Sequence, residues 1–593
     1  MGNGLHVWAP MQAVVVSVRA EVGETVAAGQ TLVILEAMKM EHIVTAEQSG
    51  LVKQVFVRPD ATVAAGDPLV LLEPSAHVEA ATDSVEEASL DDIRPDLTEV
   101  NKRHGFGLDE NRPEAVAKRR KTGQRTAREN IADLVDEGTF VEYGALVIAA
   151  QRRRRPIEDL IQRTPADGMV TGIGRVNGEA FGDAGTQCAV VSYDYTVLAG
   201  TQGTMNHLKK DRIFELAEQR GLPVILFSEG GGGRPGDTDH AIVAGLDCRA
   251  FQYFAELSGQ VPLVGVNSGR CFAGNAALLG CCDVVIATKD SNIGMGGPAM
   301  IEGGGLGVFA PDEIGPSASQ YRNGVIDVLV DDDAEGVATA KKYLSYFQGA
   351  VADWVCADQR LLRSAIPENR LRVYNVRNVI ETLADTESVL ELRGGFGAGM
   401  VTALTRVEGK PVGVIANDPM HLGGAIDGEA ADKASDFMRL CSTFGIPLVF
   451  LCDTPGFMVG PDAEETALVK RAAKLFTTGA SLRVPFCTIV LRKGYGLGAQ
   501  SMAGGSFKAP AFTISWPSGE FGAMGLEGAV KLAFRKELES VTDPAARDKM
   551  IEQMVDKLYE RGKAVNMAEH FEIDAVIDPV ESRRWILSAI APR

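Results

Sequence analysis

The sequence predicts an all-β domain at the N-terminus, followed by a much larger α/β region that is built twice. Residues 25–29 (TVAAG) recur as residues 62–66, which indicates two related β units. Further along, residues 221–227 (GLPVILF) resemble residues 445–451 (GIPLVFL), and both copies alternate short aliphatic strands with helical patterns. A chain of 593 residues is also too long for one core, because domains average roughly 100–200 residues.

The composition is that of a globular, acidic chain. Its formal net charge of −20 argues against nucleic acid as a partner. The nine cysteines form no CxxC pair, so we expect neither a metal site nor a disulfide framework, and a reducing cytoplasm suits them. No signal pattern stands at the N-terminus and no apolar run reaches the ~18 residues of a membrane span, so no membrane partner is expected. The histidines are scattered, and three are expected to be structural or surface residues: His207, His240 and His421.

Residues 1–74 are expected to form the all-β domain. Residues 31–35 (TLVIL) read as a strand and residues 42–46 (HIVTA) as the returning strand, which puts Lys39 at or near the tip of a hairpin. The repeat at an offset of 37 predicts a small barrel with pseudo-twofold symmetry, since each unit alone would leave an apolar face exposed.

Lys39 is flanked by methionines at positions 38 and 40. A lone lysine at a hairpin tip is usually only solvated, but solubility does not explain a methionine on each side. Residues 36–41 (EAMKME) resemble the biotinylation site of biotin carboxyl carrier domains, and the resemblance covers all of residues 1–74. It implies the biotinyl/lipoyl-type barrel, biotin joined to Lys39 through an amide, and a biotin protein ligase as a partner. Lipoyl domains share the fold but usually carry a tip without methionine on both sides.

Residues 75–110 are expected to be an acidic, flexible linker. The stretch 75–99 has almost no aromatic residues and cannot bury enough apolar surface to fold alone. Its twenty-odd residues would reach on the order of 70 Å when extended. The segment is either a plain linker or a tether whose mobility lets Lys39 visit more than one site.

The α/β region is expected to divide into residues 111–350 and residues 351–593, with a helix-like join near residues 347–371. Residues 112–137 begin the region with a basic, helical pattern. The four arginines at 152–155 are either a solvated or subunit-contact turn, or a clamp for the phosphates of coenzyme A, because arginine forks suit phosphate oxygens.

One glycine-rich turn lies between a strand and a helix in each half, at residues 269–277 (GRCFAGNAA) and 493–500 (KGYGLGAQ). Small residues let backbone N–H groups face a ligand, and a helix N-terminus adds unpaired donors and partial positive charge. Such a turn is either a tight connection without a ligand or an oxyanion hole, a site for developing negative charge. Its presence at corresponding places in both halves favours the oxyanion hole.

A second glycine-rich loop follows an upstream strand in each half, at residues 229–234 (EGGGGR) and 453–457 (DTPGF). No Gly-Lys-Ser/Thr follows the four glycines, so a phosphate-binding loop is rejected. We expect a loop that lies close to an acyl group, with Gly231, Gly232 and Arg234 as its substrate-loop residues.

Residues from about 115 to 593 resemble the carboxyltransferase subunit of acyl-CoA carboxylases, of the propionyl-CoA carboxylase β type. The resemblance rests on residues 122–129 (TGQRTARE), 167–172 (DGMVTG), 413–420 (GVIANDPM), 453–457 (DTPGF) and 524–530 (MGLEGAV). It implies two tandem crotonase-like domains (ββα spiral), with acyl-CoA bound to the first and carboxybiotin entering against the second domain of a neighbouring protomer. It also implies a homo-oligomer, usually a ring hexamer, and a place in fatty acid metabolism.

The reaction that this resemblance implies needs no acid or base from a side chain. Carboxybiotin yields CO2 and a ureido anion, the anion takes the α-proton of the thioester, and the enolate attacks CO2. The backbone N–H groups of Ala273 and Gly274 are the candidates for holding the thioester enolate. Those of Leu497 and Gly498 are the candidates for the ureido oxygen.

Three departures from the family pattern leave parts of the function open. The first-half loop usually reads Ser-Gly-Gly-Ala-Arg where residues 230–234 read GGGGR, and the second-half turn usually reads Tyr-Gly-Gly-Ala-Tyr-Asp where residues 495–500 read YGLGAQ. That last position helps set acyl-chain choice in relatives, so Gln500 leaves the acyl substrate open. The carrier is also more often fused to biotin carboxylase. A separate biotin carboxylase chain is therefore expected, which would use ATP, Mg and bicarbonate.

Two other functions stay open at this point. A biotin-dependent decarboxylase or transcarboxylase component would have a similar transferase region. A non-catalytic assembly scaffold with decayed sites is the other alternative, although the intact glycines in both turns speak against it.

Overall fold

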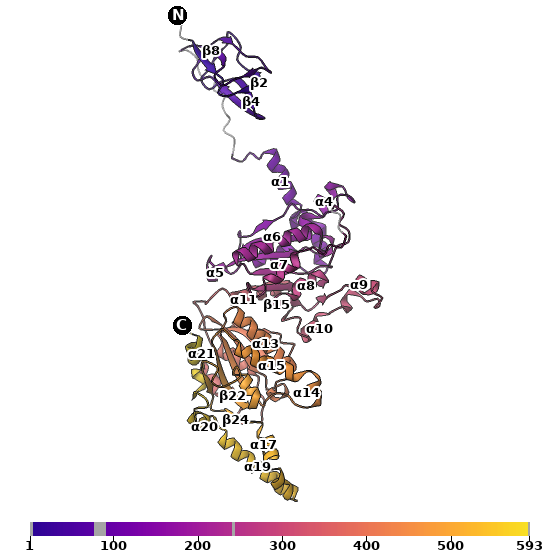
Figure 1. Cartoon of the computed structure of the whole chain (residues 1–593), viewed down its shortest axis with the longest axis vertical. Coiled ribbons are helices and arrows are strands. Elements are labelled where there is room, and N and C mark those ends of the chain that lie inside the picture. Colours follow the sequence, from indigo (N-terminus) through magenta and orange to yellow (C-terminus); the bar gives the residue numbers. More distant parts are fainter. Residues whose placement is uncertain (1–3, 76–89, 240–242, 591–593) are drawn as a thin grey trace. The chain divides into compact units, whose positions relative to one another are not determined.

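The computed structural model describes residues 4–75, 90–239 and 243–590 of the chain. Internal contacts divide the chain into two compact units, residues 1–99 and residues 100–593 (Figure 1). Each unit has a hydrophobic core of its own. Within the described ranges, no helix is both long and apolar enough to cross a bilayer.

The first unit is built from eight strands, which confirms the predicted all-β domain. In chain order they are β1 Leu5–Trp8, β2 Ala13–Val18, β3 Thr25–Val26, β4 Thr31–Ala37, β5 Met40–Thr45, β6 Gly50–Val55, β7 Thr62–Val63 and β8 Pro68–Pro74. They form two four-stranded sheets, with strand orders β1-β8-β6-β3 and β5-β4-β2-β7. The side chains buried between the sheets include Val15, Leu32, Leu35, Val52, Leu69 and Leu72.

The repeat in the sequence is also a repeat in the structure. An offset of 37 residues maps β2 onto β6, β3 onto β7 and β4 onto β8, and therefore maps one sheet onto the other. The irregularity in register between β2 and β4 recurs between β6 and β8. Gly29 and Gly66 both have a φ of 86°, as their predicted turns require. Each sheet covers the apolar face of the other, so neither repeat is expected to fold alone.

The segment expected as a linker, residues 75–110, is partly described. Residues 76–89 lie outside the described ranges. Where the chain is described again, Pro95–Gly105 form helix α1 and Asp109–Asn111 form a short 3-10 helix, η1. The sequence interpretation did not include α1, which has proline at its first position and three basic residues in its last turn, both favourable for a helix.

The second unit begins with a seven-stranded sheet whose order is β17-β15-β13-β12-β11-β10-β9. Strands β9 to β11 pair antiparallel, and the five strands from β11 to β17 run parallel. The strands are β9 Val141–Tyr143, β10 Met169–Arg175, β11 Gln187–Tyr193, β12 Val224–Phe227, β13 Leu263–Asn267, β15 Val284–Thr288 and β17 Val328–Val330, with β14 Arg270–Phe272 and β16 Asn292–Gly294 as a separate pair. The helices are α2 Pro113–Arg120, α3 Ala127–Leu134, α4 Ile157–Arg163, α5 Gly178–Phe181, α6 Thr204–Arg220, α7 Ala250–Glu256, α8 Gly274–Gly280, α9 Pro298–Gly303, α10 Ser317–Arg322 and α11 Asp333–Ser345.

A second sheet follows, with strand order β18-β19-β20-β21-β22-β23-β25 and with β24 paired to β22. The strands are β18 Leu390–Leu392, β19 Met400–Val407, β20 Lys410–Asn417, β21 Leu448–Thr454, β22 Phe486–Tyr495, β23 Thr513–Ser515, β24 Glu520–Gly522 and β25 Ala575–Val576. The helices are α12 Val376–Leu383, α13 Gly428–Thr443, α14 Pro461–Glu465, α15 Leu468–Ala480, α16 Gly496–Ser501, α17 Leu526–Ala533, α18 Arg535–Ser540, α19 Pro544–Arg561, α20 Ala564–Glu569 and α21 Ser582–Ile590.

The two sheets match strand for strand, which confirms the predicted duplication. Each has two antiparallel pairings at one edge and then only parallel ones. The short 3-10 helices η3 (Leu198–Gly200) and η6 (Leu422–Gly424) correspond at an offset of 224 residues. The halves differ in one respect: β13 and β14 are separate strands, whereas β22 is continuous and pairs with both β23 and β24.

Two helical predictions need correction. Residues 112–137 form two helices, α2 and α3, because a turn with Gly123 at a φ of 75° separates them. Thr126 and Glu129 then form a reciprocal capping box at the start of α3. The join at 347–371 is largely irregular and contains only a short 3-10 helix, η5 (Gln359–Ser364), because residues such as Pro367 interrupt the helical pattern.

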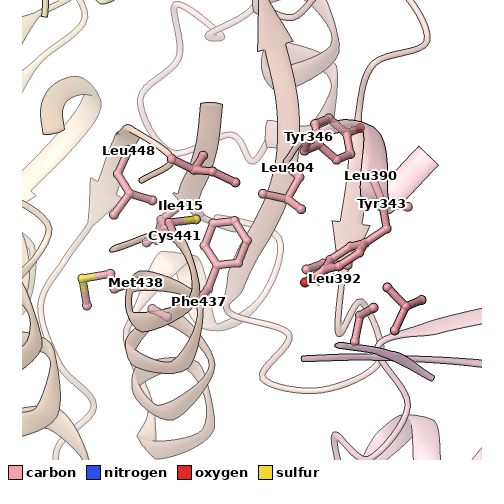
Figure 2. Close-up of a cluster of buried hydrophobic side chains, with 14 of the residues drawn as sticks. Tyr343, Tyr346, Leu390, Leu392, Leu404, Ile415, Phe437, Met438, Cys441 and Leu448 are labelled. Atoms are coloured by element: carbon pink, nitrogen blue, oxygen red, sulfur yellow. The ribbon is translucent and has the colours of Figure 1, made fainter. Parts of the chain in front are cut away.

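The largest core cluster spans both halves of the second unit (Figure 2). Tyr343 and Tyr346, at the end of α11, pack with Leu404 of β19, and Phe437 of α13 packs with Ile415 of β20 in the same cluster. The halves therefore share buried apolar surface and form one packed body around this cluster.

The shared core yields a stability prediction. Leu404 is fully buried, so Leu404→Ala should lower the free energy of unfolding by about 2–5 kcal/mol through lost burial and a residual cavity. Leu532→Ala is the matched control, because Leu532 is 68% exposed on α17 and should change the value by less than about 0.5 kcal/mol. Urea unfolding followed by circular dichroism measures both. Equal effects would contradict a continuous core between the halves.

Candidate active site

Lys39 lies at the tip of the β4–β5 hairpin. Ala37 pairs with Met40, so Met38 and Lys39 form a two-residue turn. Their φ angles are 53° and 66°, positive at both central residues as the tight hairpin turn requires. Met38 is 99% exposed, and Lys39 is exposed beside it. Asparagine and glycine are the residues that favour this turn, so two long side chains held there point to a local function.

The glycine-rich loop after β12 is held against the backbone of Gln202. The Gln202 N–H donates to the Gly232 carbonyl at 2.7 Å, and the Arg234 N–H donates to the Gln202 carbonyl at 2.8 Å. The Gly232 N–H donates to Asn275 Oδ1 at 3.1 Å. Between these bonded residues, the amide of Gly233 makes no hydrogen bond within the described part of the chain. The loop therefore presents one free donor.

Helix α8 begins beside this loop. A Cβ added to Gly232 would lie 2.8 Å from the Cβ of Ala273, the residue that precedes the helix. The Ala273 amide donates to the Gly294 carbonyl at 3.0 Å, so it is not a free donor, and the expected pair of Ala273 and Gly274 needs correction there. The Gly274 amide lies in the first turn of α8 and has no partner among the described residues. Among the described residues, the loop therefore offers the free amide of Gly233 and the start of α8 offers that of Gly274.

The second half repeats the loop geometry at an offset of 224 residues. The Ile426 N–H donates to the Gly456 carbonyl at 3.0 Å, and the Met458 N–H donates to the Ile426 carbonyl at 2.9 Å. The amide of Phe457, between them, has no hydrogen-bond partner in the described ranges. The loop after β21 thus presents one free donor in the same place as the loop after β12.

Helix α16 begins beside the second loop and carries Leu497 and Gly498 in its first turn. Neither amide has a partner within the helix or elsewhere among the described residues. A Cβ added to Gly498 would lie 2.6 Å from the Cα of Gly456, so the two main chains are in direct contact. The structure therefore brings both predicted residues of the second turn to the second loop.

The three residues expected to face a substrate in the first loop are bonded within the protein instead. Gly231 donates its N–H to the Ala199 carbonyl at 3.1 Å, and Gly232 donates to Asn275 as described above. The Arg234 side chain is only 5% exposed, and its Nη1 lies 2.6 Å from Asp167 Oδ1. Arg234 is thus a buried structural residue that fixes the end of the loop, which corrects the expected substrate contact.

A buried carboxylate precedes each loop, Glu229 in the first half and Asp453 in the second. Glu229 is paired with Arg119, whose Nη1 donates to it at 2.9 Å. Asp453 accepts from the Tyr374 hydroxyl at 2.8 Å and from Arg492 Nε at 3.2 Å. Burial raises the pKa of Glu229, and Arg119 opposes that rise. The sequence interpretation missed both carboxylates, because their partners lie far along the chain and no local pattern joins them.

His207 does not supply a base near neutral pH. His207 Nδ1 lies 3.1 Å from Cys248 Sγ, and burial lowers the pKa of His207 to about 3. His421 is a partly exposed residue 3.6 Å from Asp427. His240 lies outside the described residues. Within residues 4–75, 90–239 and 243–590, no group of three or more His, Cys, Asp or Glu is arranged to hold a metal ion.

Two further candidates lie on the surface. Gln500 is exposed on α16 and makes no hydrogen bond through its side chain among the described residues. The arginines at 152–155 form a turn in which Arg152 pairs with Asp239 at 3.3 Å and Arg155 pairs with Asp159 at 3.2 Å. Binding of coenzyme A phosphates at this turn stays a prediction.

Two family descriptions match the chain. The carboxyl transferase domain matches residues 118–591, and the biotin-requiring enzyme family matches residues 6–72. Among curated proteins, the methylmalonyl-CoA carboxyltransferase 12S subunit of Propionibacterium freudenreichii is 33% identical over 494 residues, covering 80% of this chain and 90% of that protein. The biotin-dependent long chain acyl-coenzyme A carboxylase beta4 subunit of Mycobacterium tuberculosis is 32% identical over 514 residues, covering 82% of this chain and 92% of that subunit.

Solved structures extend the similarity to the whole chain. A single-chain, multi-domain long-chain acyl-CoA carboxylase superposes with a TM-score of 0.82 and 55% identity, over 99% of this chain. This chain spans 56% of the length of that protein. The transcarboxylase 12S structure, described as a hexamer with methylmalonyl-coenzyme A bound, gives a TM-score of 0.72 and 30% identity over 85% of this chain and 96% of that one.

The placement of Arg234 predicts a structural effect. Arg234→Met should lower the free energy of unfolding by about 3–5 kcal/mol, because it leaves Asp167 buried without its charged partner. The double variant Arg234→Met/Asp167→Leu should recover part of this loss, since it removes the Asp167 charge and leaves only Asp237, 3.3 Å from Arg234 in the wild type, without its charged partner. Arg212→Met is the control, because Arg212 is exposed and its ion pair with Glu215 contributes little. Urea unfolding measures all three, and an Arg234→Met variant as stable as wild type would contradict the structural role.

Proposed function

Because the chain belongs to the carboxyl transferase family and carries a biotin-requiring domain ahead of that region, we propose that Lys39 holds biotin and that each half of the second unit forms one oxyanion hole. The chain is a carboxyltransferase with a biotin carrier domain, and both halves have the crotonase-like fold. The proposed reaction transfers a carboxyl group from biotin to the α-carbon of an acyl-CoA.

The observation that carries this proposal is the matched geometry of the two halves. Each half places a free loop amide, from Gly233 or Phe457, beside a helix whose first-turn amides are also free, at Gly274 or Leu497. Two convergent N–H donors are what a carbonyl oxygen needs when it gains negative charge. Two such sites in one fold suit a reaction in which two carbonyl oxygens gain charge, one on each substrate.

The Lys39 side chain fits the attachment of a prosthetic group. Its amine stands at the exposed tip of a hairpin, between two exposed methionines. Biotin supplies, when bound, a ureido ring that carries the carboxyl group. The methionines offer apolar surface beside the amine, which suits recognition of the tip by a ligase and by the transferase.

In the first half, the amides of Gly233 and Gly274 are proposed to hold the thioester oxygen. They would stabilise the enolate that forms when the α-proton leaves the acyl group, and removing one such donor typically costs roughly 3–4 kcal/mol of barrier. In the second half, the amides of Phe457, Leu497 and Gly498 are proposed to hold the oxygen of the ureido ring. Neutral main-chain donors stabilise charge without competing for the transferred proton.

The partners are proposed from the relatives. Transcarboxylase 12S is described as a hexamer. We propose that this protein likewise forms a homo-oligomer of six chains. A separate biotin carboxylase would load biotin with the use of ATP, Mg and bicarbonate, and a biotin protein ligase would modify Lys39.

The acyl group is the part of the function that experiment has to assign. The names of two relatives point to long-chain acyl-CoA, and Gln500 is the residue proposed to influence acyl choice from its exposed position on α16. A panel of acyl-CoAs from acetyl to palmitoyl, tested with the biotinylated chain and a biotin carboxylase, would rank the substrates.

A specific observation, the similarity to transcarboxylase 12S, keeps an ATP-independent transfer between two acyl-CoAs as the second candidate. Turnover that requires ATP would exclude it.

Lys39→Arg should abolish carboxylation, because the guanidinium keeps the charge but offers no amine for the amide link. Intact-mass spectrometry after incubation with biotin protein ligase should show one biotin on the wild type and none on the variant. Lys53→Arg is the control, because Lys53 is an exposed lysine of the same domain and pairs with Glu73 at 2.6 Å. Biotin on Lys39→Arg, or a wild type without it, would overturn the assignment.

Gly498→Ala should lower the rate of carboxyl transfer by roughly 100- to 1000-fold, the effect of losing one oxyanion donor. The added methyl would meet the Gly456 main chain at 2.6 Å and separate the loop from the helix. Gly280→Ala is the matched control, since a Cβ at Gly280, at the end of α8, meets nothing within 4 Å. Biotinylation and thermal unfolding of both variants are measured alongside the rate. Near-normal transfer by folded Gly498→Ala would remove this position from the site.

A further inference from the structure

Lys210 is a buried cation behind the first-half loop. It lies on α6 with no exposed surface, and its Nζ donates to the Tyr193 hydroxyl at 3.0 Å and to Gln202 Oε1 at 2.9 Å. No carboxylate contacts this Nζ within the described residues. Burying an ammonium group costs free energy unless the group is paired with an opposite charge and hydrogen-bonded. The position of Lys210 therefore points to a function for its charge.

The contacts of Lys210 continue through two amide side chains to the loop. Gln202 Nε2 donates to Asn275 Oδ1 at 3.3 Å, and the same oxygen accepts the Gly232 N–H at 3.1 Å. Asn275 Nδ2 donates to the carbonyls of Gly200 and Ser228 at 3.3 and 3.2 Å. Each of the two side-chain amides is thus hydrogen-bonded through both its oxygen and its nitrogen. The chain of bonds from Lys210 ends at Gly232, the residue before the free amide of Gly233.

The same chain also reaches the start of α8. A Cβ added to Gly274 would lie 3.0 Å from Gln202 Nε2. Gln202 therefore touches both components of the first-half hole: its backbone brackets Gly233, and its side chain lies against Gly274. Lys210 orients the dipole of the Gln202 side-chain amide, and this dipole polarises both free amides, those of Gly233 and Gly274.

The second half has no equivalent of this chain. The positions that correspond to Gln202, Lys210 and Asn275 are occupied by Ile426, Ala434 and Gly498. There the loop and the helix meet through the main chains of Gly456 and Gly498. The polar chain is therefore not needed to build this loop geometry, because the second half builds it from apolar residues.

The neighbouring residue, Lys209, provides a contrast. Its Nζ donates to the carbonyl of Ala166 at 3.1 Å and also to that of Met169. Its second-half counterpart, Lys433, likewise donates to a main-chain carbonyl, that of Phe396, at 3.0 Å. The lysine that occurs in both halves supports the backbone, whereas Lys210 occurs only behind the hole assigned to the acyl-CoA.

We propose that Lys210, acting through Gln202 and Asn275, is a positioning residue of the acyl-thioester half of the reaction. It fixes the amides of Gly233 and Gly274 and places a positive charge behind the oxygen that becomes the enolate. This inference rests on the proposed function of the first-half hole and adds an electrostatic asymmetry between the two holes.

The pH dependence of the reaction should reveal this charge. The groups that face Lys210 are Tyr193 on β11, Asp167 before β10, Cys248 before α7, and Asp211 and His207 on α6. Burial lowers the pKa of Lys210 to about 7. The charge is present below that pH and is lost above it, so the rate that it supports should fall as the pH rises through about 7.

Folding stability should change in the opposite direction. In the unfolded chain Lys210 keeps its ordinary pKa, so between pH ~7 and pH ~10 the unfolded state binds more protons than the folded state. The contribution of Lys210 to stability therefore rises with pH in that window. A residue with only a structural role would make activity and stability change together, whereas the proposed role makes them diverge.

The test uses the full-length biotinylated chain in the reverse direction. The carboxylated product of the best acyl-CoA of the panel is the carboxyl donor, added free biotin is the acceptor that allows repeated turnover, and formation of the decarboxylated acyl-CoA is the measurement. Between pH 6 and 9, kcat of the wild type should fall above pH ~7. At pH 6, Lys210→Met should lower kcat by roughly 10- to 100-fold with KM nearly unchanged, and its kcat should lack the fall above pH ~7. Lys209→Met is the matched control: it should lower the thermal midpoint but keep the wild-type kcat and pH profile in its folded fraction.

The double variant Gln202→Ile/Lys210→Met protects the test against misfolding, because it installs the second-half residue at 202 and removes the Gln202 Oε1 that Lys210→Met alone leaves without its donor. It should lose no more kcat than Lys210→Met alone, since the chain acts as a unit. A folded double variant with wild-type kcat and pH profile would overturn the inference. A wild type without carboxyl transfer to any acyl-CoA of the panel would overturn the proposed function instead, and the inference with it.

Discussion

The close approach of each glycine-rich loop to the helix beside it is the constraint on which the rest of the site depends. Gly498 lies against the Gly456 main chain with no room for a Cβ, and a Cβ added to Gly232 would lie 2.8 Å from the Cβ of Ala273. Buried amides are normally paired, yet within the described residues those of Gly233 and Phe457 have no hydrogen-bond partner. The parallel sheets provide the support, because each loop leaves the carboxyl end of a buried strand and cannot move away from the helix beside it.

The duplication explains why the same geometry occurs twice, and the differences between the copies explain how one fold can hold two unlike substrates. The second half joins loop and helix through glycine alone, and it leaves Leu497 exposed at the opening. The first half inserts Asn275 between them and connects it to Lys210. A thioester enolate carries a full negative charge and profits from a cation behind it, whereas a ureido oxygen shares its charge with two nitrogens and needs less. The asymmetry therefore follows the chemistry proposed for each half.

The features that the sequence predicts correctly are those encoded locally or by repetition. The hairpin of Lys39 follows from two short strands around a turn, and the matched sheets follow from blocks that recur in order. The errors concern residues whose roles are set by distant partners. Arg234 resembles a ligand-binding arginine until Asp167, 67 residues away, is seen to hold it. Ala273 resembles a free donor until Gly294 takes its amide. Lys210 gave no signal, because a buried lysine in a helix resembles a surface lysine until the packing is known.

A site made of main-chain amides has a further consequence. Main-chain amides do not titrate in the physiological range, and His207 on α6 stays neutral there because burial lowers its pKa to about 3. The donors themselves therefore give the reaction no pH dependence in the physiological range. Any such dependence has to come from groups that act on the donors from behind. In the first half that group is Lys210, which is connected to the loop by the side-chain amides of Gln202 and Asn275. These amides do not ionise in this pH range, so the sensitivity to pH resides in a residue that never touches the substrate.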